Sequence, residues 1–297
     1  MNINNWWIAS RPKTLIVSIA PVFLGLSLAF HNGYFNSFFI GLFTLIAAIL
    51  IQIGTNLIND LYDFLNGADN ANRIGPVRVV QSGLLSESSV RLGAFLCFGL
   101  SLLIGIYLVF IGGIPILLIG SFAVLSGYCY TAGPYPLGYN GLGDIFVFIF
   151  FGLIAVPGTY YLQHLQKNLL FDIDSILIGS SIGFIAVAIL CVNNIRDIIS
   201  DSNVGKKTLA VRFGKKPIIF LYDAMLILPY VCIFLVFIRD NFYWDLGLCL
   251  LLFSIPIAVK LIIDIHNKEG EDLNSVLIGT ISFMKTFSML LILGIIL

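Results

Sequence analysis

The sequence predicts an all-α, polytopic membrane protein with nine transmembrane helices. Of its 297 residues, 59% are hydrophobic and only 11% are charged, and the mean hydropathy is +0.99. A soluble domain has about a quarter of its residues charged. The apolar residues form runs long enough to cross a bilayer, and most basic residues fall in alternate loops. Together these features indicate a protein whose main solvent is lipid.

Nine apolar runs have the length of a membrane span. About 20 helical residues cross the roughly 30 Å of hydrocarbon, and a segment in lipid satisfies its backbone groups within itself only as a helix. In chain order the runs cover residues 12–30, 40–58, 92–111, 114–131, 142–162, 175–196, 218–238, 243–263 and 275–297. The sequence GGIP marks the boundary between the third and fourth runs, and the division between these two stays open.

Polar residues mark the ends of several runs. Arg11 and Lys13 lie at the start of the first run, and Asp144 lies near the start of the fifth. The second and sixth runs each continue into an acidic stretch. Interfacial aromatic residues lie near span ends, as is usual in membrane proteins; they include Trp6, Trp7, Tyr34, Tyr135 and Tyr139. These boundaries support the division of the chain into spans.

Loop charges predict the orientation. Basic residues follow the second span at Arg73, Arg78 and Arg91, and a larger group follows the sixth span: Lys206, Lys207, Arg212, Lys215 and Lys216. The opposite side carries few basic residues. By the positive-inside rule, the N-terminus and both acidic loops are expected to be cytoplasmic.

Composition argues against other function classes. The formal net charge is zero and the sequence pI is about 6.8, so no general basic field indicates nucleic acid as a partner. The cysteines lie in apolar runs without a C-x-x-C pair, which predicts neither a disulfide framework nor a metal site.

Two polar stretches interrupt this apolar chain. "NLINDLYDFLNGAD" covers residues 56–69, and "NNIRDIISDSNVGKK" covers residues 193–207. Each places Asn just before or near Asp, then a second Asp three or four residues later, then Gly and basic residues. Their separation is close to half the chain. The pattern suggests one transmembrane domain over residues 1–297 with a pseudo-repeat, about 1–135 and 136–297, in which each half supplies one acidic motif.

Helical spacing places each set of polar residues on one face. Positions i, i+3, i+4 and i+7 of a helix share a face. In the first stretch these positions are Asn56, Asn59, Asp60 and Asp63. In the second, the same rule groups Asn193, Arg196, Asp197, Ser200 and Asp201. Neighbouring carboxylates repel one another unless a cation lies between them, and Mg²⁺ commonly joins one or two carboxylates to phosphate oxygens.

Basic residues beyond each acidic face suit an anionic ligand. Arg78, Lys206 and Lys207 are placed to hold phosphate oxygens. The two stretches therefore predict a site that grips a metal–diphosphate group from two sides. The alternative is that these residues are solvated helix ends, the commoner role for a single such cluster. Two clusters that each begin within apolar sequence favour function, because carboxylates inside a membrane are costly.

Five segments, in the same order, resemble the UbiA superfamily of intramembrane prenyltransferases. They are RPKTL (11–15), NDLYDFLNGAD (59–69), RIGPVRVVQSGLLS (73–86), GYNGLGDIFVFIFFG (138–152) and NNIRDIISDSNVGKKTLAVRFG (193–214). Within the superfamily they are most similar to the branch that acts on 1,4-dihydroxy-2-naphthoate in menaquinone biosynthesis. The chain departs from the broad N-D-x-x-D-x-x-x-D pattern, because Gly67 occupies the last position and the third acidic residue is Asp69.

The resemblance implies a fold, a reaction and a location. It implies nine helices around a central cavity in the inner membrane of a bacterial cell, with the acidic loops at the cytoplasmic end. It implies two Mg²⁺ ions, a polyprenyl diphosphate donor and 1,4-dihydroxy-2-naphthoate as acceptor. The expected reaction joins the prenyl group to the ring with loss of carbon dioxide, which gives demethylmenaquinol.

The resemblance also assigns roles to residues. The expected catalytic and metal-binding residues are Asp60, Asp63, Asp197 and Asp201. The expected substrate-binding residues are Asn56, Asn59, Arg78, Gln81, Tyr130, Asp144, Asn193, Arg196, Lys206 and Lys207. Tyr62, Tyr128 and Tyr130 are candidates to stabilise an allylic cation through their ring faces.

Two other functions fit parts of the sequence. A prenyltransferase that uses another aromatic acceptor would share the acidic motifs. A secondary transporter would share the many spans and the approximate halves, but its ionisable residues would lie near the bilayer midplane. Here they gather at span ends on one side, which favours the enzyme.

Overall fold

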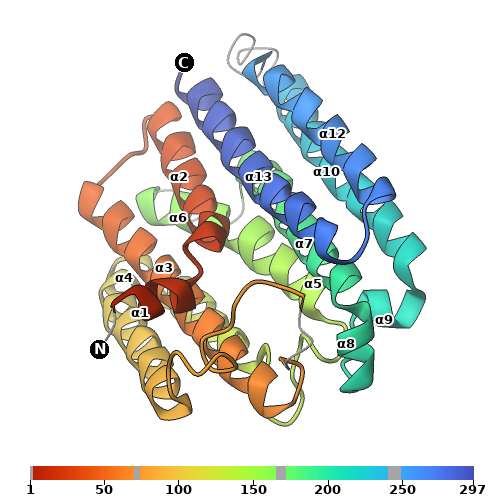
Figure 1. Ribbon diagram of the computed structural model, residues 1–297. Coiled ribbons are helices and arrows are strands. Elements are labelled where there is room, and N and C mark those ends of the chain that lie inside the picture. Colours follow the sequence, from red (N-terminus) through yellow and green to blue (C-terminus); the bar gives the residue numbers. More distant parts are fainter. Residues whose placement is uncertain (1–2, 70–73, 165–171, 240–248) are drawn as a thin grey trace.

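The computed structural model describes residues 3–69, 74–164, 172–239 and 249–297, and every regular element in these ranges is a helix (Figure 1). The first half contains α1 (Ile3–Ser10), η1 (Pro12–Leu15), α2 (Ile16–His31), α3 (Phe38–Leu65) and α4 (Glu87–Cys129). The next elements are α5 (Gly143–Val147), η2 (Phe148–Ile154), α6 (Ala155–Gln163), α7 (Ile173–Arg196), α8 (Ile198–Asn203) and α9 (Leu209–Phe213). The chain continues with α10 (Lys215–Arg239), η4 (Leu250–Ser254), α12 (Ile255–Asn267), η5 (Gly270–Asp272) and α13 (Leu273–Ile296).

The long element α4 is a hairpin of two spans. Its backbone leaves the helical region at Gly113, where φ is 69°, two residues before Pro115. The rings of Phe95 and Tyr128 stack with centroids 6.5 Å apart, although a straight helix would separate them by about 50 Å. The chain therefore reverses at the predicted GGIP boundary, because glycine adopts this backbone conformation without strain.

The described part of the chain confirms a polytopic helical protein. Eight helical elements are long and apolar enough to cross a membrane. Since α4 folds back on itself, these elements make nine passes, as the hydropathy predicts. The predicted span 243–263 begins inside residues 240–248, which lie outside the described ranges. Its described part is η4 followed by α12.

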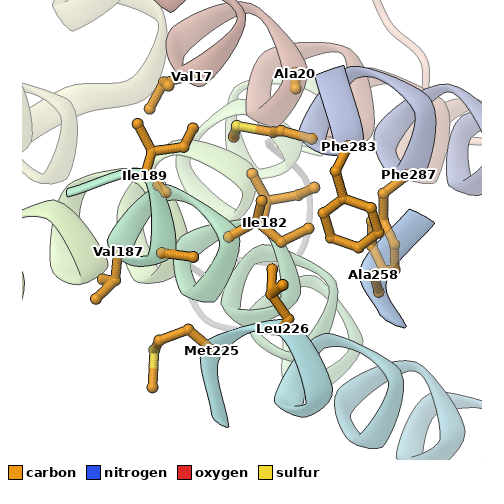
Figure 2. Packing of buried hydrophobic residues seen from close by; sticks show 14 of the residues in the cluster. Val17, Ala20, Ile182, Val187, Ile189, Met225, Leu226, Ala258, Phe283 and Phe287 are labelled. Atoms are coloured by element: carbon orange, nitrogen blue, oxygen red, sulfur yellow. The ribbon is translucent and has the colours of Figure 1, made fainter. Parts of the chain in front are cut away.

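The bundle core is built around α7. In α7, 78% of the most apolar 18-residue stretch is buried, whereas only 17% of the corresponding stretch of α4 is buried. Figure 2 shows Ile182 of α7 lying near Leu226 of α10 and Phe283 of α13, and all three belong to one buried cluster. Large apolar side chains elsewhere face outward, such as Phe110 at 86% exposure. In a bilayer these outward side chains contact lipid.

The fifth span approaches α7 very closely. This span runs through α5, the π-helical η2 and α6, and η2 packs on α7. A Cβ added to Gly183 of α7 would lie 2.6 Å from the Cα of Gly152 in η2. Gly179 and Gly183 form a small-xxx-small pattern, which lets two backbones pack directly in lipid. The π turn at η2 is a feature often found at functional sites.

The acidic stretches come together at one end of the bundle. In Figure 1 the orange segment after α3 and the green α8 lie at the same end. The loop after α3 is tied back to that helix, because Val79 and Val80 donate their backbone N–H groups to Asp60 at 3.1 and 3.0 Å. The fold thus brings both halves of the chain to one polar end.

Candidate active site

A cavity of about 990 Å³ is lined by residues of this polar end and by apolar residues of the bundle. Ligand pockets typically measure roughly 300–1,000 Å³. Its walls are mainly apolar and include Val17, Ile51, Ile106, Leu117 and Leu162. The predicted site residues that line it are Asn56, Asn59, Asp63, Arg78, Tyr130, Asp144, Asn193, Arg196, Asp197, Asp201 and Lys206. One space therefore joins a charged end to a long apolar interior.

Lys206 joins the two acidic motifs. Its Nζ lies 4.0 Å from Oδ1 of Asp63 and 3.3 Å from Oδ1 of Asp201. Tyr139 donates its hydroxyl to Asp63 at 2.9 Å, and the Lys206 ammonium lies 5.2 Å from the Tyr139 ring centre. The side chain of Lys206 is only 18% exposed. The positive charge thus offsets the repulsion between carboxylates that come from different halves of the chain.

Burial and charge shift the protonation of this group. Burial raises the pKa of Asp201 to about 6. Burial by itself lowers the pKa of Lys206, but the charges of Asp63, Asp201 and Asp197 outweigh it, so the pKa of Lys206 is raised. Burial and the nearby Asp63 also raise the pKa of Tyr139. The lysine is consequently held charged and the tyrosine neutral near pH 7.

Arg78 supplies a second cation with an unused donor. Its Nε lies 3.1 Å from Oδ2 of Asp69 and its Nη2 lies 3.5 Å from Oδ2 of Asp63. The side chain is 11% exposed and lines the cavity. Its Nη1 is buried and has no hydrogen-bond partner among the described residues. A buried guanidinium N–H of this kind is costly unless a ligand accepts from it.

Asp60 holds a loop and does not line the cavity. Both of its carboxylate oxygens accept backbone N–H groups, from Val79 and Val80. Asp60 is 2% exposed and is absent from the cavity wall. The structure thus places Asp60 away from the position expected of a metal ligand. This geometry favours a role in fixing the loop that carries Arg78.

Arg196 fixes Asp197 and contacts the last helix. Its Nε and Nη2 donate to the two oxygens of Asp197 at 2.8 and 2.7 Å. Its Nη1 donates to Oδ1 of Asn274 at 3.0 Å, and Nδ2 of Asn274 donates to the carbonyl of Ile74 at 2.9 Å. No sequence pattern points to Asn274, because a lone Asn in the first turn of a helix is common and its partners lie far away in the chain.

Asp144 is a further buried carboxylate in the cavity wall. Asp144 begins α5 and is 7% exposed. Its Oδ1 has no hydrogen-bond partner among the described residues. Tyr130 also lines the cavity, and burial raises its pKa. These two residues stand where a polar ring substituent of a ligand would find a partner.

Comparison with known proteins places the chain in a family. The model of the UbiA prenyltransferase family matches residues 18–283. The chain belongs to the UbiA prenyltransferase family. This confirms the resemblance drawn from the five sequence segments.

Three relatives are 32% to 40% identical to this UbiA family member over the aligned residues. The chain is 40% identical to 1,4-dihydroxy-2-naphthoate octaprenyltransferase of Haemophilus influenzae over 219 residues, which are 70% of this chain and 69% of the relative. The protein of that name from Bacillus subtilis is 35% identical over 227 residues, 76% of this chain and 71% of the relative. The one from Mycobacterium leprae is 32% identical over 278 residues, 93% and 90% of the two chains.

Solved structures share the fold. A UbiA homologue from Archaeoglobus fulgidus bound to DMAPP and Mg²⁺ has a TM-score of 0.63 at 16% identity, and the match covers 97% of this chain and 99% of the homologue. A digeranylgeranylglyceryl phosphate synthase also has a TM-score of 0.63, at 17% identity over 99% and 98% of the two chains. The nine-pass bundle is thus the UbiA fold.

Some residues expected at the UbiA site lie elsewhere. Gln81 does not line the cavity. Lys207 is exposed, and its backbone N–H donates to the carbonyl of Tyr139. Tyr62 and Tyr128 also lie outside the wall; their hydroxyls are 3.3 Å apart. The wall also includes polar residues that the sequence did not assign to the site, among them Gln52, Thr131 and Asn194.

The oxygen donors at the polar end suit a magnesium ion shared with a substrate. The wall presents carboxylates of Asp63, Asp197 and Asp201 and the side-chain amides of Asn59 and Asn193. In the described ranges no three Asp, Glu, His or Cys side chains converge on a single metal position. Mg²⁺ usually keeps several waters and takes one or two protein carboxylates together with phosphate oxygens. The residues present therefore fit a metal–diphosphate and not an ion held by protein alone.

Proposed function

We propose that this protein transfers a polyprenyl group from polyprenyl diphosphate to 1,4-dihydroxy-2-naphthoate, with loss of carbon dioxide and formation of demethylmenaquinol. The proposal places it in a bacterial inner membrane, with the polar end of the bundle in the cytoplasm. Basic residues concentrate at that end, as the positive-inside rule requires. The names of the bacterial relatives support the acceptor.

One observation carries the proposal: a cluster of buried charges closes the end of a long apolar cavity. Asp63, Asp201 and Lys206 form this cluster, and Nη1 of Arg78 adds a donor that has no partner among the described residues. A polyprenyl diphosphate is divided in the same way, since its strongly anionic diphosphate head is attached to a long hydrocarbon chain. A transporter would instead place its ionisable residues near the midplane.

The charged end would hold the diphosphate. Nη1 of Arg78 and Nζ of Lys206 would donate to phosphate oxygens. Asp63, Asp197 and Asp201, with Asn59 and Asn193, would hold the metal. Two Mg²⁺ ions, when bound, would neutralise the diphosphate and make it a better leaving group. The A. fulgidus homologue bound to DMAPP and Mg²⁺ supports this choice of ligand and ion.

The proposed transfer of the prenyl group needs no added oxidant or reductant. The bond between the allylic carbon and the diphosphate oxygen breaks, and the diphosphate leaves with the electron pair. The ring carbon that bears the carboxylate forms the new carbon–carbon bond. The bond from that carbon to the carboxylate then breaks, carbon dioxide leaves, and its electron pair restores the aromatic ring. The apolar wall excludes water, which would otherwise capture the allylic cation.

Asp144 would orient the acceptor, and Tyr130 would face the allylic cation. The unpaired Oδ1 of Asp144 would accept a hydrogen bond from a ring hydroxyl. This hydrogen bond would raise the electron density on the hydroxyl oxygen, which would make the reacting ring carbon more nucleophilic. The ring face of Tyr130 would lie against the allylic cation.

An acceptor screen tests the proposed function. The purified protein is incubated with a labelled polyprenyl diphosphate and a panel of aromatic acids, with and without a chelator. We expect a product only from the dihydroxynaphthoate, with the mass of a prenylated ring that has lost carbon dioxide, and no product with the chelator. A product that retains the carboxylate, a different preferred acceptor, or donor flux into liposomes without turnover would contradict the proposal.

A further inference from the structure

We propose that Asn274 is a positioning residue that locks the two acidic loops into one site. The inference rests on the proposed function, in that the locked loops are those expected to hold the diphosphate. Asn274 lies in the first turn of α13, outside both acidic motifs. It does not line the cavity, so it acts through the residues that do.

Asn274 is the meeting point of two chain segments. Its Oδ1 accepts from Nη1 of Arg196 at 3.0 Å, and its Nδ2 donates to the carbonyl of Ile74 at 2.9 Å. Arg196 ends α7 and carries the second motif, whereas Ile74 belongs to the loop after the first motif. One amide thereby satisfies a donor from one half of the chain and an acceptor from the other. Few side chains can do both, because the task needs an acceptor and a donor on one rigid group.

The loop that carries Arg78 is held at two points. Asn274 binds it at Ile74, and Asp60 binds it at Val79 and Val80. Arg78 lies between these anchors and lines the same cavity as Asp197. The anchors come from α13 and α3, so both must stay in place for Arg78 to keep its position.

The second acidic motif also depends on the side-chain amide of Asn274. Arg196 has a side chain that is 1% exposed, and two of its nitrogens hold Asp197. If Asn274 loses its oxygen, Nη1 of Arg196 becomes a buried donor without this partner. The guanidinium would then have to turn to find another acceptor, and Asp197 would turn with it. Loss of the amide is therefore expected to disturb the donor-binding end and leave the acceptor end unchanged.

Two variants and a matched control test the inference. Asn274→Leu removes both hydrogen bonds. Asn274→Asp keeps an acceptor for Arg196 but cannot donate to Ile74, so it releases only the loop. Asn267→Leu makes the same kind of change at the end of α12, where the exposed Asn267 bonds only within its own helix, to the carbonyl of Ile263.

The first readout needs no catalysis. Hydrogen–deuterium exchange of the peptide covering residues 74–86 is measured without substrate. We expect faster exchange in both Asn274 variants and wild-type exchange in Asn267→Leu. If Asn274→Leu does not fold, Asn274→Asp still decides the question, because its Arg196 contact is retained. Wild-type exchange in a folded Asn274 variant would overturn the inference even if the acceptor screen supports the proposed function.

The second readout separates the two substrates. We expect KM for the polyprenyl diphosphate to rise about tenfold in Asn274→Asp, the effect of about one lost buried hydrogen bond. KM for the acceptor should stay within about twofold of wild type. Equal increases in both KM values, or none, would overturn the positioning role. If the acceptor screen identifies another acceptor, KM is measured for that acceptor instead of the naphthoate. The hydrogen–deuterium exchange result is independent of which acceptor is used.

Discussion

Asp63 and Asp201 lie on either side of one ammonium group, that of Lys206, although they come from opposite halves of the chain. Two buried carboxylates so close to one another need a shared cation. In this structure the lysine supplies that charge. Under the proposed function, a metal-bound diphosphate would share the same space with Lys206.

Replacing Lys206 separates its two effects. In Lys206→Met the ammonium no longer competes for the carboxylates, so we expect the protein to bind Mg²⁺ more tightly in the absence of donor. The variant also loses a phosphate contact, so kcat/KM for the donor should fall about 100-fold. Lys207→Met is the control, because Lys207 is exposed. Equal effects of both substitutions would contradict the geometry.

The two aspartates of the first motif should behave differently. Asp63→Asn is expected to raise the half-saturating Mg²⁺ concentration and to lower turnover about 100-fold. Asp60→Asn leaves one backbone N–H of the loop without an acceptor, at a cost of about 1–3 kcal/mol. It should lower the melting temperature and leave the half-saturating Mg²⁺ concentration unchanged. The assignment fails if both variants shift the Mg²⁺ requirement equally.

Metal affinity should depend on pH. Because burial raises the pKa of Asp201 to about 6, this carboxyl is protonated in the metal-free protein below pH 6. Metal binding there must displace a proton, so apparent Mg²⁺ affinity should fall by up to about tenfold per pH unit below pH 6 and level off above it. Asp201→Asn should remove this dependence. A flat Mg²⁺ affinity between pH 5 and 7 in the wild type would argue against the ligand role.

The same pKa makes a separate contribution to stability. A carboxyl whose folded-state pKa lies above its ordinary value of 3.8 binds more protons folded than unfolded between those two values. The contribution of Asp201 to the free energy of unfolding is therefore present at low pH and is lost as the pH rises through about 6. Thermal unfolding of wild type and Asp201→Asn between pH 4 and 7 measures this difference. The variant should be less sensitive to pH over this range.

The contact between the fifth span and α7 should tolerate no side chain. Gly183→Ala places a Cβ 2.6 Å from the Cα of Gly152, and backbone must move to relieve it. Such overpacking costs about 1–3 kcal/mol. Gly99→Ala is the control, since a Cβ there meets nothing within 4 Å. Thermal unfolding in detergent should show a loss for the first variant only, and equal melting temperatures would refute the close packing.

Hydropathy was enough to predict the spans because lipid requires long apolar helices. It even located the reversal in α4, since GGIP contains the glycine that adopts φ 69°. The motifs also predicted that two acidic stretches belong to one site. The pseudo-repeat of the two halves stays a prediction.

Helical spacing was too coarse for the roles of single residues. Asp60 and Asp63 share a broad face of α3, yet the loop after α3 folds back over one and leaves the other at the cavity. Gly67 departs from the broad family pattern at a position with φ 76°, where glycine is favoured. The roles of Asn274 and Tyr139 depend on contacts between distant segments, which no local pattern records.

The most direct test of the central proposal is a double-mutant cycle on ligand binding. Calorimetry measures the affinity of an unreactive thio-diphosphate analogue of the donor, with Mg²⁺, for wild type, Asp63→Asn, Asp201→Asn and the double variant. If both carboxylates serve one metal–diphosphate group, each single variant should bind at least about tenfold more weakly, and the double variant should bind little worse than either. Binding within about twofold of wild type in either single variant, or fully additive losses, would contradict the shared site.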